Sequence, residues 1–226
     1  MGTRKEDLDE ILEALSYGTF DENDEADFYS IVVQPFSEKY KKPFDYATGA
    51  TKGVLIFEQL GFVIKIPFCR NTEDCYYNST YGEYECCYFT GADTDNGWDY
   101  CEAEANKYQR AEEEGVSVCF AKTEKIGEID GYPIYMQELA DIYRSIDYQS
   151  SHTEEDSRQV SSICNSNNFY MFNLEWLSDA FHYYGEKMFH KLLEFIRTVG
   201  INDLHDGNIG YIGNRPVLVD YSSFDS

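Results

Sequence analysis

The chain has 226 residues, a length that favours one domain or one domain built from two lobes. Its 42 acidic and 18 basic side chains give a formal net charge of −24, and such a field repels nucleic acids and anionic membranes. Direct DNA or RNA binding is disfavoured, because neutralisation of phosphates by Lys and Arg dominates that affinity. The same field attracts basic partners, including proteins that normally bind DNA, although an acidic surface can also serve solubility alone.

Hydrophobic periodicity predicts a helix, a hairpin and a second helix in the first half of the chain. A capping box at Thr3 and Glu6 starts the first helix, and apolar residues at helical spacing continue it to Leu15. Two short apolar runs, 54–60 and 62–68, predict the two strands of a hairpin. In the second helix, helical spacing places five residues on one face: Cys101, Glu104, Ala105, Tyr108 and Ala111.

The segment 69–97 is rich in Cys, Tyr, Gly and Asp, lacks a clear periodicity, and is interpreted as an inserted loop. The chain has seven cysteines and no C-x-x-C pair at zinc spacing, so a metal site or disulfide in this segment is only weakly signalled. An odd cysteine count without a signal peptide predicts a reduced, cytoplasmic protein. No apolar run reaches transmembrane length, so no membrane partner is expected. The cysteines of the segment are Cys69, Cys75, Cys86 and Cys87.

The second half is predicted to contain two strands, a loop, one long helix and a final hairpin. The loop is the polar segment 149–168, and the helix runs over 175–197 until Gly200 stops it. The expected strands are 116–121 and 132–139, and those of the final hairpin are 209–212 and 217–219. Antiparallel strands that alternate with separate helices predict an α+β fold.

Three polar residues near the end of the sequence have the chemistry of a magnesium–triphosphate site. Asp203 and Asn208 lie in the loop after the long predicted helix, and Asp220 follows the apolar run 217–219. Hard oxygen ligands on short loops, at the ends of buried elements, suit Mg²⁺ and phosphate. The alternative is a simple turn, because Asp, Gly and Asn are typical turn residues.

The spacing of these residues resembles the protein-kinase-like superfamily. Its catalytic loop reads H-R-D-x-x-x-x-N, and Asp203 to Asn208 match the D-x-x-x-x-N part. Asp220-Tyr221-Ser222 falls on the D-F-G position. The catalytic-loop segment is most similar to the aminoglycoside-phosphotransferase type and to small atypical bacterial and phage kinase-like proteins. Its sequence is Asp203-Leu204-His205-Asp206-Gly207-Asn208.

The resemblance implies a two-lobed fold and departs from the family pattern at two points. The His of H-R-D is Ile201 here, which keeps an apolar packing role but not the hydrogen bonds. The sequence ends six residues after Asp220, so the expectation is a truncated C-lobe that stops just after the D-F-G-like position. The expected divisions are an N-terminal helix and acidic loop at 1–45, an N-lobe at 46–138 with the insertion 69–97, and a minimal C-lobe at 139–226.

The resemblance also requires a lysine on an N-lobe strand. Lys65 lies in the otherwise apolar run 62–67, where burial of its charge costs free energy unless a carboxylate or phosphate meets it. Glu104 is the expected carboxylate partner and Glu102 the second choice. The alternative for Lys65 is an edge-strand lysine that guards against aggregation.

Further roles follow from the resemblance residue by residue. Gly49 and Gly53 take the place of the glycine loop, without the full G-x-G-x-x-G pattern, and Glu138 falls near the hinge that would hold adenine. Asp203 would orient or deprotonate the acceptor, and His205 would lie near the transferred phosphate. Lys65 would grip the α- and β-phosphates, and the Mg²⁺ or Mn²⁺ ligands would be Asn208 and Asp220.

The function expected from this pattern is binding of Mg-ATP, with phosphate transfer to an unknown acceptor. A first alternative is a kinase-like binding module without turnover, motivated by the absence of the protein-substrate platform after Asp220. A second alternative is an acidic mimic of nucleic acid, of phage or mobile-element origin, that inhibits a basic host protein. The charge of −24 motivates this last hypothesis.

Overall fold

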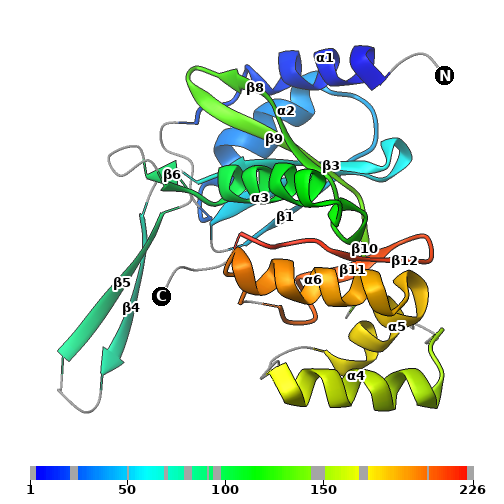
Figure 1. Cartoon of the computed structure of the whole chain (residues 1–226). Coiled ribbons are helices and arrows are strands. Elements are labelled where there is room, and N and C mark those ends of the chain that lie inside the picture. The colour runs from blue at the N-terminus through cyan, green and yellow to red at the C-terminus, as the bar shows by residue number, and fades with distance from the viewer. Residues whose placement is uncertain are drawn as a thin grey trace. The chain divides into compact units, whose positions relative to one another are not determined.

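The computed structural model describes residues 4–20, 25–49, 51–68, 71–78, 83–90, 92–93, 98–143, 151–167, 173–202 and 204–222, with the backbone alone described between 71 and 99. The predicted α+β class is confirmed (Figure 1). The chain divides into two compact units. Unit 1 comprises Met1–Glu102 and Glu124–Gln137, and unit 2 comprises Ala103–Thr123 and Glu138–Ser226.

Unit 1 is built on a five-stranded antiparallel sheet in the order β1-β2-β3-β9-β8. The predicted hairpin is confirmed as β2 and β3, in which Val54 lies opposite Lys65. Since β3 is the third of five strands, it has a hydrogen-bonded neighbour on each side. The strands are β1 (Asp45–Thr48), β2 (Lys52–Phe57), β3 (Phe62–Pro67), β8 (Thr123–Ile129) and β9 (Tyr132–Glu138).

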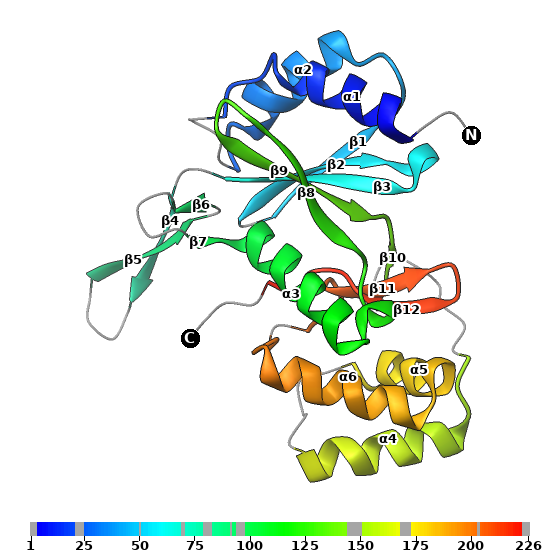
Figure 2. The same cartoon turned by 45° about the horizontal axis from the view of Figure 1, so that its top comes forward.

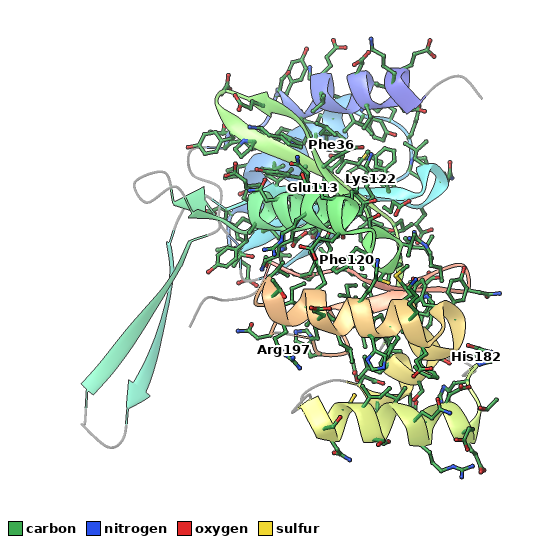
Figure 3. The ribbon with its side chains drawn as sticks, viewed as in Figure 1. Phe36, Glu113, Phe120, Lys122, His182 and Arg197 are labelled. Carbon is green, nitrogen blue, oxygen red and sulfur yellow. The ribbon has the colours of Figure 1, made fainter. Side chains whose placement is uncertain are left out.

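Helices cover one face of this sheet (Figure 2). They are α1 (Arg4–Leu15), which confirms the first predicted helix, a π-helical turn (Tyr29–Val33) and α2 (Gln34–Lys39), which begins beside Pro35. The covered face carries alternate residues of β2 and β3, because successive side chains of a strand point to opposite sides. Phe36 of α2 lies within this core (Figure 3), together with Leu55, Phe57, Phe62, Ile64 and Ile66.

Two small two-stranded sheets follow β3 in the chain. The prediction of a loop over 69–97 is wrong for β4 (Asn71–Asn78) and β5 (Glu83–Thr90), which pair antiparallel, and for the short pair β6 (Ala92–Asp93) and β7 (Trp98–Asp99). Tyr, Phe and Thr favour strands, and this propensity outweighs the missing alternation. Cys69 and the side chains of the other three cysteines lie outside the described residues, so a metal or disulfide there stays a prediction.

Unit 2 combines helices with the predicted C-terminal hairpin, which is confirmed. The hairpin β11–β12 lies alongside α5 and α6 (Figure 1), and β10 adds a third strand to it. Trp176, Phe189 and Phe195 are buried in its core with apolar residues of the hairpin. The elements are α3 (Tyr100–Glu114), β10 (Asp141–Ile142), α4 (Glu154–Asn167), α5 (Leu174–Tyr184), α6 (Glu186–Thr198), β11 (Ile209–Ile212) and β12 (Arg215–Leu218).

The predicted strand at 116–121 is wrong, and the chain instead forms a 3-10 turn at Ser117–Cys119. Val116 donates its N–H to the carbonyl of Ala111, so the backbone continues directly from the end of α3. Val116, Cys119 and Phe120 are buried in the unit 2 core, whereas Val118 is exposed. A short apolar run does not distinguish a strand from another buried segment, which explains the error.

The predicted helix over 175–197 is two helices that meet at Gly185. This residue has φ 76° and ψ 161°, a backbone region that only glycine adopts readily. Its N–H donates to the carbonyl of Phe181 and its own carbonyl accepts from Phe189, so it ends α5 and begins α6. Apolar periodicity continues across the break because both helices bury one face, and this continuity conceals the break in the sequence.

The predicted loop over 149–168 is wrong where α4 forms. A reciprocal cap starts α4: the N–H and hydroxyl of Thr153 donate to Asp156 Oδ2 at 2.8 Å each, and the Asp156 N–H donates to the Thr153 hydroxyl. Val160 and Cys164 are the buried residues of a weakly apolar helix, so the cap carries the signal better than periodicity does.

We expect Gly53→Ala to destabilise the protein by about 1–3 kcal/mol through overpacking. A Cβ at this position would lie 2.2 Å from Cε2 of the Phe28 ring, which packs directly against the backbone of Gly53. Urea unfolding measures the loss. The control is Gly127→Ala, whose Cβ would meet only Leu12 Cδ1 at 3.7 Å. Equal stability of the two variants would show that Phe28 does not press on Gly53.

The α4 cap predicts a pH-dependent loss of stability in Asp156→Asn. Hydrogen bonds from Thr153 to the carboxylate, and then the neighbouring His182, hold the pKa of Asp156 below its ordinary value. His182 Nδ1 lies 2.9 Å from Asp156 Oδ2. A depressed folded-state pKa stabilises above the unfolded-state pKa, and the contribution disappears as pH falls through the folded-state value.

The expected cost of Asp156→Asn is therefore about 1 kcal/mol at pH 7, with a smaller difference from wild type at about pH 3. Urea unfolding at both pH values checks this, and Asp141→Asn, an exposed carboxyl outside any helix cap, serves as control. A difference between wild type and Asp156→Asn that stayed constant down to acid pH would contradict the cap.

Candidate functional site

The C-terminal hairpin brings two of the predicted metal ligands together. Asn208 precedes β11 and Asp220 follows β12. The carbonyl oxygen of Asn208 accepts the N–H of Val219 at 2.8 Å and that of Asp220 at 3.4 Å. Asn208 is 8% exposed and Asp220 is half-buried. The backbones of the two residues are thus adjacent, and their side chains carry an amide oxygen and a carboxylate, which are both hard oxygen donors.

The segment after Asp220 is fixed by its own contacts. Ser222 Oγ donates to Asp220 Oδ1 at 3.1 Å, and Lys107 of α3 donates to the Ser222 carbonyl. Tyr221, which occupies the second position of the D-F-G-like triplet, is 1% exposed and donates its hydroxyl to the carbonyl of Ala121. The triplet therefore anchors its buried ring in unit 2 and keeps the Asp220 carboxylate at the end of β12.

The loop that carries the other two predicted residues is only partly described. Asp203 lies outside the described residues, so its catalytic role stays a prediction. His205 is exposed, and its carbonyl accepts the N–H of Asn208 at 2.8 Å. Its Nδ1 accepts the N–H of Gly207 at 2.9 Å, which places the proton of the neutral imidazole on Nε2.

Lys65 lies in unit 1, where all six residues of β3 are buried and the lysine itself is 4% exposed. The edge-strand alternative is wrong, because β3 has neighbours on both sides of the sheet. A lysine in the middle of a sheet does not serve to block edge-to-edge association. Burial of an ammonium group costs free energy, and charged or polar contacts must offset this cost. The buried position of Lys65 therefore implies such contacts.

Glu104 lies on α3, in unit 2, and is fully buried, whereas Glu102 is exposed. A carboxylate with no exposure needs hydrogen bonds or a cation, so burial favours Glu104 over Glu102 as a functional glutamate. Lys65 belongs to unit 1 and Glu104 to unit 2. The ion pair between them therefore stays a prediction from the resemblance.

The remaining predicted residues have identified structural contacts. Gly49 donates its N–H to the carbonyl of Lys52 at 2.9 Å and closes the turn between β1 and β2. Gly53 makes room for the Phe28 ring on the helix-covered face of the sheet. The Glu138 carboxylate accepts a hydrogen bond from the backbone N–H of Lys122 at 3.0 Å and another from Nη2 of Arg215 at 3.1 Å. These contacts explain the two glycines and the carboxylate locally, and their ligand-binding roles stay predictions.

Asp179 of α5 is a buried carboxylate that joins the hairpin to the segment before α4 through hydrogen bonds. Its Oδ2 accepts the Tyr211 hydroxyl of β11 at 2.9 Å. Its Oδ1 accepts the Ser151 and His152 N–H groups at 2.8 and 3.0 Å, and the Ser151 hydroxyl at 3.0 Å, with His152 Nδ1 at 2.9 Å. The one sequence signal is an acidic residue on the apolar face of a helix, one helical turn after Trp176.

Cysteine chemistry is disfavoured at the described thiols. Cys101, Cys119 and Cys164 are buried and not in disulfides. Burial raises the pKa of Cys119 to about 12 and also raises the pKa of Cys164. Since the thiolate is the reactive form, neither Cys119 nor Cys164 is a nucleophile at neutral pH.

No family model matches the chain, and no curated protein shows significant similarity to it. Within the described ranges, three or more His, Cys, Asp or Glu side chains do not gather as a metal site. In the same ranges, no helix combines the length and apolar character needed to span a bilayer.

Removing the hydroxyl that Asp179 receives from β11 should loosen the hairpin. We expect Tyr211→Phe to cost about 1.5–3 kcal/mol, the usual contribution of a buried hydrogen bond to a charged group. The control is Tyr143→Phe, which removes an exposed hydrogen bond to Glu175 and should cost well under about 1 kcal/mol. Urea unfolding provides the comparison, and equal losses would show that Asp179 does not hold β11.

Proposed function

We propose that this chain binds Mg-ATP in the manner of a protein-kinase-like domain, with Asn208 and Asp220 as metal ligands. The observation that carries the proposal is the pair of hydrogen bonds to the Asn208 carbonyl, which holds the backbones of an asparagine and an aspartate together at the open end of a hairpin. The two residues match the Asn of D-x-x-x-x-N and the Asp of D-F-G in type, order and spacing.

The donor set fits Mg²⁺. This cation prefers one or two carboxylate or carbonyl oxygens from the protein and fills its other positions with water and phosphate oxygens. Asn208 and Asp220 offer such a set without the clustered carboxylates or thiolates of a dedicated metal cage. When bound, the ion would neutralise charge on the β- and γ-phosphates of the nucleotide.

The order of elements in the chain also supports the proposal. A buried strand lysine, Lys65, comes first, a helix with the buried Glu104 follows, and β8 and β9 come next. In protein kinases the lysine on the third strand and the glutamate of the following helix act on the α- and β-phosphates. Lys65 is on the third strand of its sheet, and α3 is the next long helix in the sequence.

Turnover would be transfer of the γ-phosphoryl group to an acceptor hydroxyl. The acceptor oxygen forms a bond to the γ-phosphorus, the bond from that phosphorus to the β,γ-bridging oxygen breaks, and ADP leaves. The acceptor proton passes to Asp203, the base position of the kinase catalytic loop. The chemistry of the site identifies the acceptor only as a nucleophilic hydroxyl.

We expect Mg-ATP to raise the melting temperature of the wild-type protein and to leave Asp220→Asn unmoved. Ligand that binds only the folded state stabilises it by an amount set by the ratio of free ligand to Kd, about 2.7 kcal/mol at 100 times Kd. Asn keeps the size of Asp but removes the negative charge that holds a divalent ion. Thermal unfolding with Mg-ATP, and with ATP plus a chelator, measures the shift.

Asp141→Asn is the matched control, because it removes one exposed carboxylate of the same unit and should keep the full shift. Absence of any shift in the wild type would refute the proposal. Release of phosphate from ATP, or its transfer to an acceptor, that is lost in Asp203→Ala would establish turnover. Binding without such chemistry would identify a nucleotide-binding module.

A further inference from the structure

The hairpin β2–β3 carries two lysines on the same face of the sheet. Lys52 lies opposite Pro67, and Lys65 lies opposite Val54. Residues directly opposite on antiparallel strands share a face, and residues two apart on one strand also share a face. Lys52 and Lys65 are therefore diagonal neighbours, a relation that places Cβ atoms about 7–8 Å apart.

This face is the one opposite the helix-covered core. The core takes the alternate residues of the same strands, from Leu55 and Phe57 to Ile64 and Ile66, and on β9 it takes Ile134 and Met136. On β9, Gln137 alternates with these and is 1% exposed. The second face therefore combines two lysines with an amide side chain.

Both lysines are buried, with Lys52 6% and Lys65 4% exposed. Among the described residues, they are the basic side chains that reach this degree of burial. Lysine is almost never fully buried unless other groups compensate its charge, and both lysines do interact with other groups of the chain. An anion with several negative charges is the class of ligand that two ammonium groups on one face can contact at once.

We propose that Lys52, together with Lys65, forms a polyphosphate-binding face on the β2–β3 hairpin. Lys52 is the first residue of β2 and directly follows the turn that Gly49 closes, so it lies at the end of the strand. The ligand class is a linear polyphosphate, and its identity as the triphosphate of ATP rests on the proposed function. The resemblance assigns one lysine, Lys65, to the phosphates, and the register adds Lys52 as a second.

The test compares ligands that differ only in their phosphates. Isothermal titration of the wild type should give affinities in the order ATP, ADP, AMP in the presence of Mg²⁺, and measurable binding of inorganic tripolyphosphate. Lys52→Met should weaken ATP and tripolyphosphate roughly tenfold or more, the usual loss for a hydrogen bond to a charged group. AMP binding should change much less. Lys52→Arg keeps the positive charge and should recover part of the loss.

Lys125→Met is the control, because it removes an exposed lysine of the same sheet that pairs with Glu128 at 2.6 Å. If wild type binds Mg-ATP and Lys52→Met binds every phosphate equally well, the lysine face is refuted while the proposed function stands. If tripolyphosphate binding depends on Lys52 but Asp220→Asn keeps the full Mg-ATP shift, the metal-ligand assignment fails and the lysine face stands. Absence of binding to any phosphate refutes both.

Circular dichroism would detect a loss of folding in Lys52→Met. In that case, hydrogen exchange of the wild type tests whether tripolyphosphate binds to the hairpin. Tripolyphosphate should slow the exchange of backbone amides in 52–67, the two strands that carry the lysines. Amides of α1, which packs on the opposite face of the sheet, should not change beyond the experimental error. Unchanged exchange throughout the hairpin at saturating tripolyphosphate would overturn the proposal.

Discussion

The backbone carbonyl of Asn208 is the contact on which the candidate site depends. It accepts two successive N–H groups of the returning strand, so the residue before β11 and the residue after β12 are held together by the main chain. Side-chain placement then follows from a register that the hairpin fixes. Asp179 supports the same hairpin through Tyr211, and the buried ring of Tyr221 fixes the other end. A metal site at this position would require few carboxylates, because strand pairing positions the residues that carry the donors.

The sequence predicted the hairpin that brings the backbones of Asn208 and Asp220 together. Asn208 and Asp220 flank a short hairpin, and the separation of two such residues along the chain determines their separation in space once the strands pair. Lys65 was identified as a candidate because a charged residue in an apolar run conflicts with burial, and such conflicts occur mainly at functional sites. Asp203 was predicted from the same local spacing, lies outside the described residues and stays a prediction. Local signals did not extend to Asp179, which receives its donors from the segment before α4 and from β11.

The errors in the fold arose where a signal was short or shared by two structures. One glycine divides α5 from α6, yet the apolar face continues on both sides of Gly185 and reads as a single helix. The helix α4 begins with a cap at Thr153 rather than with strong apolar periodicity. Lys52 could not be assigned to a face before the pairing of β2 with β3 was known, since a shift of one residue would send it to the helix-covered side.

The charge of the chain and its two buried lysines act over different distances. A net charge of −24 repels a polyphosphate at long range, but at physiological ionic strength charges separated by more than about 8 Å are largely screened. Recognition of an anion is then decided by groups in direct contact with it, where burial strengthens each interaction. In the proposed site, two buried ammonium groups on one sheet face would therefore select a polyphosphate on a strongly acidic protein, while the acidic exterior would disfavour the much larger polyanions of nucleic acid.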